Sequence, residues 1–228
     1  MTKYYIWSCE YNNYTGEGRL AKKFVKCFYN KKKFKILSPK NSFILSNYIY
    51  QIYGIFVLWY YFLLGKKTVY LNFLPLWNFL IFFLVPPKTE FGPITGSIQI
   101  NKIESVKSFF RSKLFPIFYI ISLNLLNFRE KKIIFATNVL IKFIKKSILK
   151  KSELNFVLRD LKKHKNKSKK TIDFLIYYRK HENKFFDHHI DFIKNKLNKN
   201  RKVVIVGDDL KLKGVLNLGR VNKKKYLN

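Results

Sequence analysis

The feature that most constrains the fold is the stretch of residues 69–97, which is rich in β-branched and aromatic side chains. Its apolar part ends at Pro86-Pro87, and the loop Gly92-Pro-Ile-Thr-Gly96 follows. A short apolar run stopped by prolines and followed by a glycine-bounded turn predicts a buried strand, a short helix and a second strand. Glycine lets the backbone approach a ligand closely, so this turn is a candidate binding loop.

Strand and helix patterns alternate along the first two thirds of the chain. Apolar β-rich runs predict strands at residues 4–7, 34–37, 69–73, 91–94, 132–136 and 154–158. Between them, helices are predicted at 19–28, from a cap at Asn41 or Ser42 through 64, and at 77–84, 102–128 and 138–146, with a kink or restart at Pro116. This alternation is typical of a parallel sheet with helices on both faces.

The composition changes at residues 162–170, which are polar, charged and without apolar periodicity. Such a run predicts a solvated linker. A second α/β unit follows, with strands predicted at 172–178, 203–206 and 215–218 and a helix at 183–197. We therefore expect an α/β protein with two parallel-sheet units, at 1–161 and 172–228, joined by a linker at 162–171.

The charge is strongly positive, with 46 Lys and Arg against 13 Asp and Glu and a formal net charge of +33. This balance favours a partner that carries negative charge, such as anionic lipid, nucleic acid or a phosphorylated small molecule. Coding bias of an A/T-rich genome, which supplies Lys, Asn, Ile, Phe and Tyr, is an equally open explanation. Nucleic acid is not expected, because no aromatic-interleaved basic face and no known binding module is visible.

Metal binding and secretion are not indicated. Cys9 and Cys27 have no metal-ligand spacing and are expected to be reduced thiols. His188-His189 point in different directions on a predicted helix, without partners that complete a ligand set. The N-terminus has no signal peptide pattern, so the protein is expected on the cytoplasmic side.

Two uncharged stretches, residues 43–65 and 68–87, are each near the roughly 20 residues that cross a bilayer. A small integral membrane protein with two spans and no catalysis is therefore the alternative. Polar residues and Pro75 interrupt the stretches, and lysines at both ends give no orientation. Peripheral attachment to an anionic membrane surface and burial as ordinary core elements both stay open.

Gly16-Glu17-Gly18 stands at the first junction of a predicted strand and helix. Such a junction exposes backbone N–H groups at a helix N-terminus, where an anion or a sugar hydroxyl group can be held. A tight turn without a ligand is the open alternative.

Several segments resemble a known family by their order and spacing. These are Ile133-Ile-Phe-Ala-Thr137, Asn155-Phe-Val-Leu-Arg-Asp160, and the runs at 174–184, 202–208 and 215–221. Together they resemble retaining glycosyltransferases of the two-Rossmann-domain (GT-B) type, family-4-like. The resemblance implies two Rossmann-like domains that face each other: an acceptor-side domain at 1–161, a basic linker at 162–171 and an incomplete donor-binding domain at 172–228. Gly16-Glu17-Gly18 and the Gly92–Gly96 loop are similar to those of bacterial members.

The resemblance implies a glycosyltransferase of cell envelope polysaccharide biosynthesis. It would transfer a sugar from a nucleoside-diphosphate-sugar to a glycan or lipid-linked acceptor, without a metal ion or other cofactor. Arg179 and Lys184 match the cations that hold the donor diphosphate, and charge growing on the leaving diphosphate is what such cations stabilise. The acceptor-side loops would be formed by Gly16, Glu17, Gly18, Gly92, Thr95 and Gly96, facing Arg179 and Lys184 across a cleft.

This sequence departs from the family pattern at Tyr178, Phe185 and Asp209, where the family has glycine. The family's glutamate-bearing segment would lie beyond Asn228, so we expect a chain truncated at the C-terminus. The resemblance assigns no catalytic residue.

Overall fold

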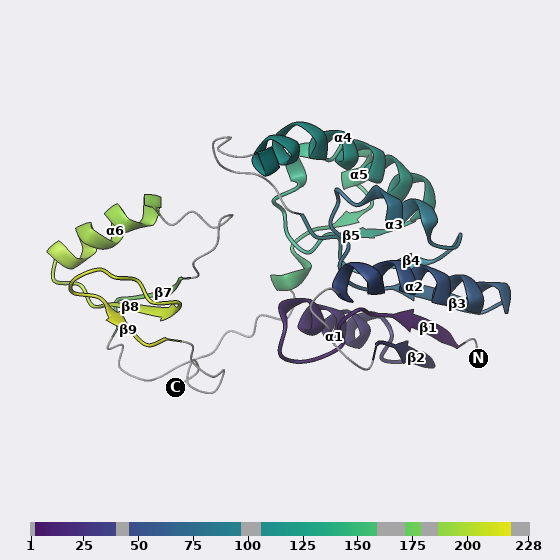
Figure 1. Ribbon diagram of the computed structural model, residues 1–228, viewed down its shortest axis with the longest axis horizontal. Helices are drawn as coiled ribbons and strands as arrows, with labels where there is room; N and C mark the ends of the chain where they lie inside the picture. Colours follow the sequence, from purple (N-terminus) through teal and green to yellow (C-terminus); the bar gives the residue numbers. More distant parts are fainter. Residues whose placement is uncertain (1–2, 40–45, 97–105, 159–171, 179–186, 220–228) are drawn as a thin grey trace. The chain divides into compact units, whose positions relative to one another are not determined.

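The computed structural model describes residues 3–39, 46–96, 106–158, 172–178 and 187–219. The chain divides into two compact units, Met1–Leu161 and Lys162–Asn228. The predicted linker at 162–171 lies outside the described residues. Each unit is described by itself below, and Figure 1 gives the element labels.

Unit 1 is built on a four-stranded parallel sheet in the order β2-β1-β3-β4. The strands are β1 (Tyr4–Trp7), β2 (Phe34–Leu37), β3 (Lys67–Tyr70) and β4 (Glu90–Phe91). In register, Ile6 of β1 pairs with Ile36 of β2 and Val69 of β3. An α/β fold with parallel strands is therefore confirmed.

Parallel pairing continues beyond β4. Ile94 forms an isolated parallel bridge with Phe135, directly after β5 (Ile133–Ile134), and β5 pairs with β6 (Ser152–Glu153). The chain goes from β1 to β2 on one side and returns to β3 on the other side of β1. The carboxyl ends of β1 and β3 therefore form the topological switch point, where open α/β sheets bind their ligands.

Helices cover both faces of this sheet. Ile6 and Val69 point to the face covered by α1 (Gly16–Phe28), where Phe24 and Val25 are buried. Trp7 and Tyr70 point to the opposite face, because alternate strand residues face opposite sides. That face is covered by α2 (Ser46–Leu63), α3 (Phe79–Leu84) and α4 (Val106–Arg129).

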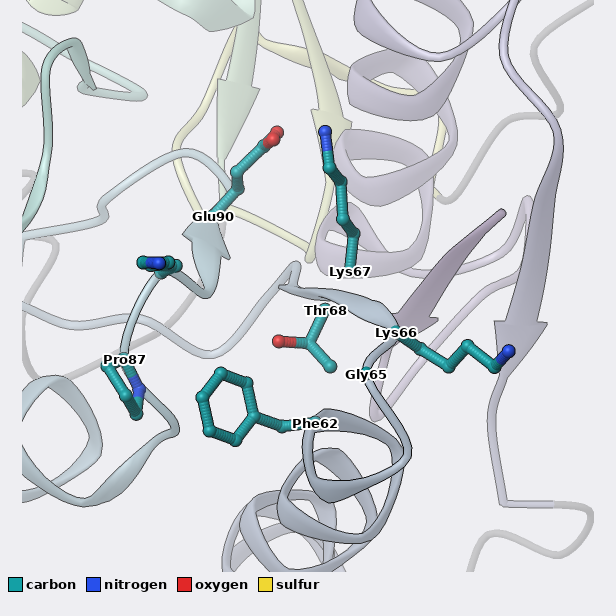
Figure 2. A pocket seen from close by; sticks show the side chains of 8 residues that line it. Phe62, Gly65, Lys66, Lys67, Thr68, Pro87 and Glu90 are labelled. Atoms are coloured by element: carbon teal, nitrogen blue, oxygen red, sulfur yellow. The ribbon is translucent and has the colours of Figure 1, made fainter. Parts of the chain in front are cut away.

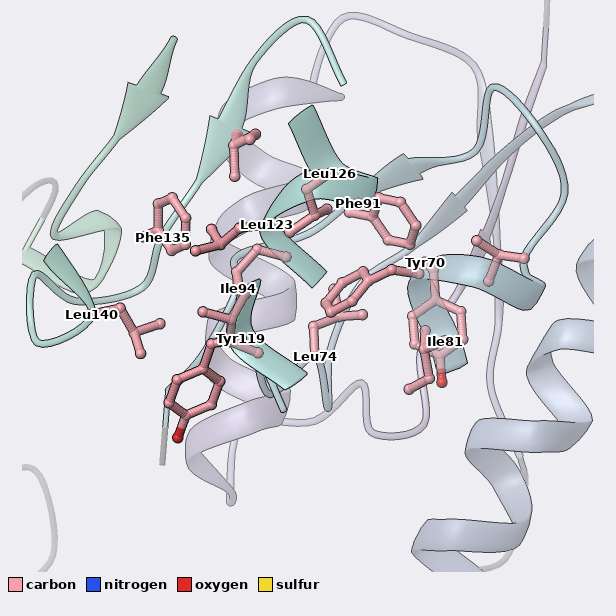
Figure 3. Close-up of a cluster of buried hydrophobic side chains, with 14 of the residues drawn as sticks. Tyr70, Leu74, Ile81, Phe91, Ile94, Tyr119, Leu123, Leu126, Phe135 and Leu140 are labelled. Carbon is pink, nitrogen blue, oxygen red and sulfur yellow. The ribbon is translucent and has the colours of Figure 1, made fainter. Parts of the chain in front are cut away.

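The larger core lies under α2, α3 and α4. Figure 3 shows its central side chains gathered between the strands and α4, among them Tyr70, Phe91, Tyr119, Leu123 and Phe135. All five are at most 7% exposed. The predicted strand and helix of the 69–97 stretch both contribute to this core.

Several sequence predictions were wrong in detail. Gly16-Glu17-Gly18 form the first turn of α1 and do not precede it. The α4 helix does not restart at Pro116 but runs through it, because its buried residues Tyr119 and Leu123 hold the helix against the core; a kink at Pro116 stays a prediction.

The part of unit 1 after β5 also differs from the prediction. The helix predicted at 138–146 is replaced by the short turns η1 (Ile141–Phe143) and α5 (Lys146–Leu149). The strand predicted at 154–158 is replaced by β6 and the 3-10 turn η2 (Phe156–Leu158).

Unit 2 contains a parallel sheet in the order β7-β8-β9. Its elements are β7 (Phe174–Tyr178), α6 (Asp187–Asn198), β8 (Val203–Gly207) and β9 (Leu216–Asn217). Ile193 of α6 packs with Val203 and Ile205 of β8 in a small core. The predicted strand–helix–strand order of this unit is confirmed for these residues.

Among the residues that the structure describes, no helix is both long and apolar enough to span a membrane. The stretch 68–87 is divided between β3, an irregular segment and α3.

Candidate ligand-binding crevice

A crevice of about 590 Å³ lies at the carboxyl ends of the strands of unit 1. The residues that line it follow β1, β3, the Ile94 bridge and β5, or begin α1. They are Glu10, Thr15, Gly16, Glu17, Leu20, Phe73, Thr95, Gly96, Ala136, Thr137 and Val157. The crevice therefore occupies the switch point of the fold.

The loop after β1 is held in place by the segment that follows β3. The buried Asn72 donates from Nδ2 to the carbonyl oxygen of Glu10 (2.7 Å), and its Oδ1 accepts the N–H of Cys9 (3.0 Å). The Ser8 hydroxyl donates to the same Glu10 carbonyl (2.6 Å). These bonds fix the backbone of Glu10 at the edge of the crevice.

The entry into α1 is also preorganised. Asn12 Oδ1 accepts the N–H groups of Tyr14 and Thr15, each at 2.9 Å. The Thr15 hydroxyl caps the helix by accepting the N–H of Gly18 (3.0 Å). A Cβ atom on Gly16 would meet nothing within 4 Å, so the first helical residue opens onto free space.

Glu17 is a half-buried carboxylate that lines the crevice. Its Oε2 accepts the backbone N–H of Phe73 (3.3 Å). Burial raises the pKa of Glu17, the Phe73 hydrogen bond lowers it, and nearby Glu10 raises it further. Phe73 has a φ of 56°, a left-handed conformation that is strained for an aromatic residue and that concentrates at functional sites.

The Thr95-Gly96 segment forms another part of the wall. Thr95 N–H donates to the Leu74 carbonyl (2.9 Å), and Thr95 O accepts the N–H of Leu76 (2.9 Å). A Cβ atom on Gly96 would lie 2.6 Å from Leu140 side-chain atoms, so a glycine allows the close approach. The wall is thus tied to the chain that follows β3.

The structure brings four of the six predicted acceptor-side residues together, because Gly16, Glu17, Thr95 and Gly96 line one crevice. Gly18 and Gly92 do not line it. A Cβ atom on Gly18 would contact Asn12, and one on Gly92 would lie 2.0 Å from the Leu71 carbonyl oxygen, so both glycines serve backbone packing. Their role in binding an acceptor stays a prediction.

Other lining residues were missed by the sequence analysis. Glu10, Phe73 and Thr137 each lie two or three residues beyond the end of a parallel strand or bridge. The rule that ligands bind outside the carboxyl ends of strands would have found them. Only the two glycine loops, at 16–18 and 92–96, were predicted as binding loops.

A second cavity of about 420 Å³ lies at the amino end of β3 and β4 (Figure 2). Lys66, Lys67 and Lys88 border it together with Phe62, Gly65, Thr68, Pro87 and Glu90. The Tyr29 hydroxyl donates to Glu90 Oε2, and the hydroxyl groups of Thr68 and Thr89 are 2.8 Å apart. Three lysines and one glutamate line this second cavity, so its charge is mainly positive. The crevice is different, because its charged lining residues are Glu10 and Glu17.

Arg179 and Lys184, the predicted donor-site cations, lie outside the described residues. The strand before them ends in a tight contact: Gly207 has a φ of 116°, and a Cβ atom there would lie 2.1 Å from the Tyr178 carbonyl oxygen. Asp208 N–H donates to that oxygen (2.9 Å). The Gly207-Asp208 turn therefore fastens the carboxyl ends of β7 and β8 together.

Across the described parts of both units, no three His, Cys, Asp or Glu residues are grouped so that they could hold a metal ion. Comparison of the sequence with protein-family models and with curated proteins gave no match.

Proposed function

We propose that the chain is a glycosyltransferase-like protein that transfers a sugar from a nucleoside-diphosphate-sugar to a glycan or lipid-linked acceptor. In this proposal the crevice of unit 1 holds the acceptor. The observation that carries it is the crevice at the switch point of the fold, which Glu17 of α1 and Thr95 of the loop after β4 both line.

The lining of the crevice favours a neutral, hydroxyl-rich ligand over an anion. Its charged residues, Glu10 and Glu17, are acidic, although the chain carries a net charge of +33. Carboxylates repel phosphate and accept strong hydrogen bonds from hydroxyl groups. Thr95 and Thr137 add hydroxyl groups, and Phe73 adds an apolar ring, as is usual in sites that combine apolar area with a few polar groups.

The donor is proposed to bind at unit 2. In the sequence Arg179 directly follows β7, a parallel strand, and the carboxyl ends of parallel strands are where α/β folds bind their ligands. In the proposal Arg179 and Lys184 place positive charge on the diphosphate, whose negative charge increases as the sugar leaves. The two cations thus take the place of a divalent metal ion.

The acceptor role is tested with a panel of neutral oligosaccharides and the variant Glu17→Gln. We expect the best-bound oligosaccharide to lose about tenfold in affinity, because a charge-assisted hydrogen bond is replaced by a weaker one. The matched control is Glu153→Gln, which removes a carboxylate paired with Lys132 outside the crevice. Equal affinity of the wild-type protein and Glu17→Gln for every sugar in the panel would contradict the acceptor role.

The donor role is tested separately by titrating nucleoside-diphosphate-sugars into the wild-type protein and the variants Arg179→Ala and Lys184→Ala. Each variant is expected to weaken donor binding by about tenfold or more, since each removes a charge-assisted contact. Lys211→Ala, which removes a described lysine of the same unit outside the donor motif, is the control. Unchanged donor affinity in both donor-site variants would remove the diphosphate role.

We also propose that the protein works on the cytoplasmic side, as a peripheral protein on the inner face of the membrane. The support for this location is the apolar outer surface of unit 1 and the excess of positive charge.

A further inference from the structure

The outer surface of the α2–α3–α4 layer is unusual for a protein of this composition. Residues 46–65, 68–87 and 114–128 contain no charged side chain, although 26% of the chain is charged. These segments include α2, α3 and most of α4, the helices that cover one face of the unit 1 sheet. Coding bias toward lysine does not explain why lysine is missing from these three segments.

Large apolar side chains stand out from all three helices. On α2 they repeat at helical spacing along one side, and on α4 they form a second stripe. The exposed fraction is 68% for Phe56, 77% for Leu63, 63% for Phe83 and 91% for Phe128. We call this set the apolar face: Ile49, Ile52, Tyr53, Phe56, Trp59, Tyr60, Leu63, Leu80, Phe83, Leu84, Ile117, Ile120, Ile121 and Phe128.

The three helices form one connected surface. The α3 helix packs against both α2 and α4. Trp59 Nε1 of α2 donates to the Leu84 carbonyl of α3 (2.7 Å), and the Arg129 guanidinium of α4 donates to the Phe82 carbonyl (2.7 Å). An apolar surface of this kind on a folded protein marks an interaction site.

Positive charge borders the apolar face where α2 and α3 end. Lys66 and Lys67 follow α2, Lys88 follows α3, and the three lysines surround the second cavity. In Figure 2 the Lys66 side chain points away from Lys67 and Glu90. Tyr and Trp side chains, here Tyr53, Tyr60 and Trp59, are enriched where proteins meet the interface between lipid and water.

We propose that unit 1 docks on an anionic lipid bilayer through the apolar face, with Lys66, Lys67 and Lys88 at the lipid headgroups. Apolar burial and attraction to anionic lipids act together in such binding. A second copy of the chain fits this surface less well, because a symmetric contact would bring the same lysines and two charges of +33 together. The inference specifies the surface behind the proposed peripheral location and requires neither donor nor acceptor.

The test is sedimentation of the full chain with vesicles, without any nucleotide-sugar or glycan. Vesicles of phosphatidylcholine mixed with phosphatidylglycerol are compared with vesicles of phosphatidylcholine alone, at near-physiological salt. We expect binding to the mixed vesicles, and a loss of about tenfold or more for Phe56→Glu and for Leu63→Glu, because each removes one anchor of the apolar face. Lys26→Gln on α1 changes the net charge by the same amount and is expected to bind like the wild-type protein.

Thermal unfolding and size-exclusion chromatography of each variant accompany the binding measurement. If the wild-type protein and Phe56→Glu bind equally to mixed vesicles, the attraction comes from charge elsewhere and the proposal is overturned. If the wild-type protein is a dimer that ignores vesicles and Phe56→Glu is a monomer, a second copy covers the face and the proposal is also overturned. A protein that binds vesicles but no sugar would leave this inference standing and remove the proposed function.

Discussion

Two helical layers cover the two faces of the unit 1 sheet, and they differ in the charge of the side chains that they expose to solvent. The α1 layer carries Arg19, Lys22, Lys23 and Lys26, whereas residues 46–65 and 114–128 of the other layer carry no charge. Both layers bury close-packed side chains on their inner sides. Burial in the core therefore does not explain why one layer is charged and the other is not. The two layers differ at outward-facing positions, where the fold does not require a particular type of residue.

The layers also differ in where their charges lie. On α1 the charge of Lys26 is exposed, but at the end of α4 the guanidinium of Arg129 and the carboxylate of Glu130 are half-buried. Charges in the α2–α3–α4 layer are thus expected to affect stability, and charges on α1 to have little effect on it. The predictions below test this contrast, from the largest effect to the smallest.

The largest effect is expected for Arg129→Met. The Arg129 guanidinium donates to the carbonyl oxygens of Phe82 (2.7 Å), Phe83 (3.4 Å), Val85 (3.0 Å) and Pro86, which end α3. Without it these acceptors lose a charged partner, and we expect the free energy of unfolding in urea to fall by about 3 kcal/mol.

The control for this prediction is Lys132→Met, which breaks an exposed ion pair with Glu153 (2.8 Å). A surface pair contributes less than about 1 kcal/mol, so this variant is expected to unfold almost like the wild-type protein. Equal destabilisation by Arg129→Met and Lys132→Met would show that the stability of the α2–α3–α4 layer does not depend on the Arg129 guanidinium.

A smaller loss is expected for Gly54→Ala, which tests the contact between α2 and the sheet. A Cβ atom at Gly54 would lie 2.0 Å from Nε1 of the buried Trp7. The overpacked core must shift, and we expect a loss of about 2 kcal/mol in the free energy of unfolding.

The matched control is Gly16→Ala at the start of α1, where a new Cβ atom meets nothing within 4 Å. We expect its stability to change by no more than about 0.5 kcal/mol. If both alanine variants unfold alike, α2 is not packed closely on Trp7.

The smallest effect is a pH dependence at Glu130. Burial raises the pKa of Glu130 to about 7, against a lowering by Arg129 and a further increase from Glu90. Below its ordinary pKa the carboxyl is protonated in both states and costs nothing. Between that ordinary pKa and about 7 the unfolded state releases the proton while the folded state keeps it, so the free energy of unfolding falls as the pH rises through this range and levels off above it.

Glu130→Gln removes this loss. We expect the variant to be more stable than the wild-type protein by on the order of 1 kcal/mol at pH 8, and equal to it near pH 4. The measurement is urea unfolding at both pH values, with Glu153→Gln as the control. A difference that is the same at pH 4 and pH 8 would contradict the role of the Glu130 carboxyl.

Much of the fold could be predicted from the sequence because its signals are local. The strands β1 and β2 have the predicted bounds, since each is a short run enriched in β-formers and bounded by polar residues. The continuation of α4 through Pro116 was not predictable from local rules, because contacts of Tyr119 and Leu123 with the distant core outweigh the lost hydrogen bond.

The candidate site was predictable only in part. The glycine loops pointed to Gly16, Glu17, Thr95 and Gly96, but the pairing of Glu10 and Glu17 near Phe73 depends on the order of the strands. Asn72 is a further example, because it fixes the Glu10 loop across a sequence separation of 62 residues. A hydrogen bond of that range has no local pattern.

Local sequence patterns account for the alternation of strands and helices and for the absence of charge from three long apolar segments. These properties depend on neighbouring residues and on composition. Only the tertiary structure decided that the three segments share one face of a sheet and that two carboxylates line one crevice. Both outcomes depend on strand order and on packing between distant residues, which no local pattern encodes.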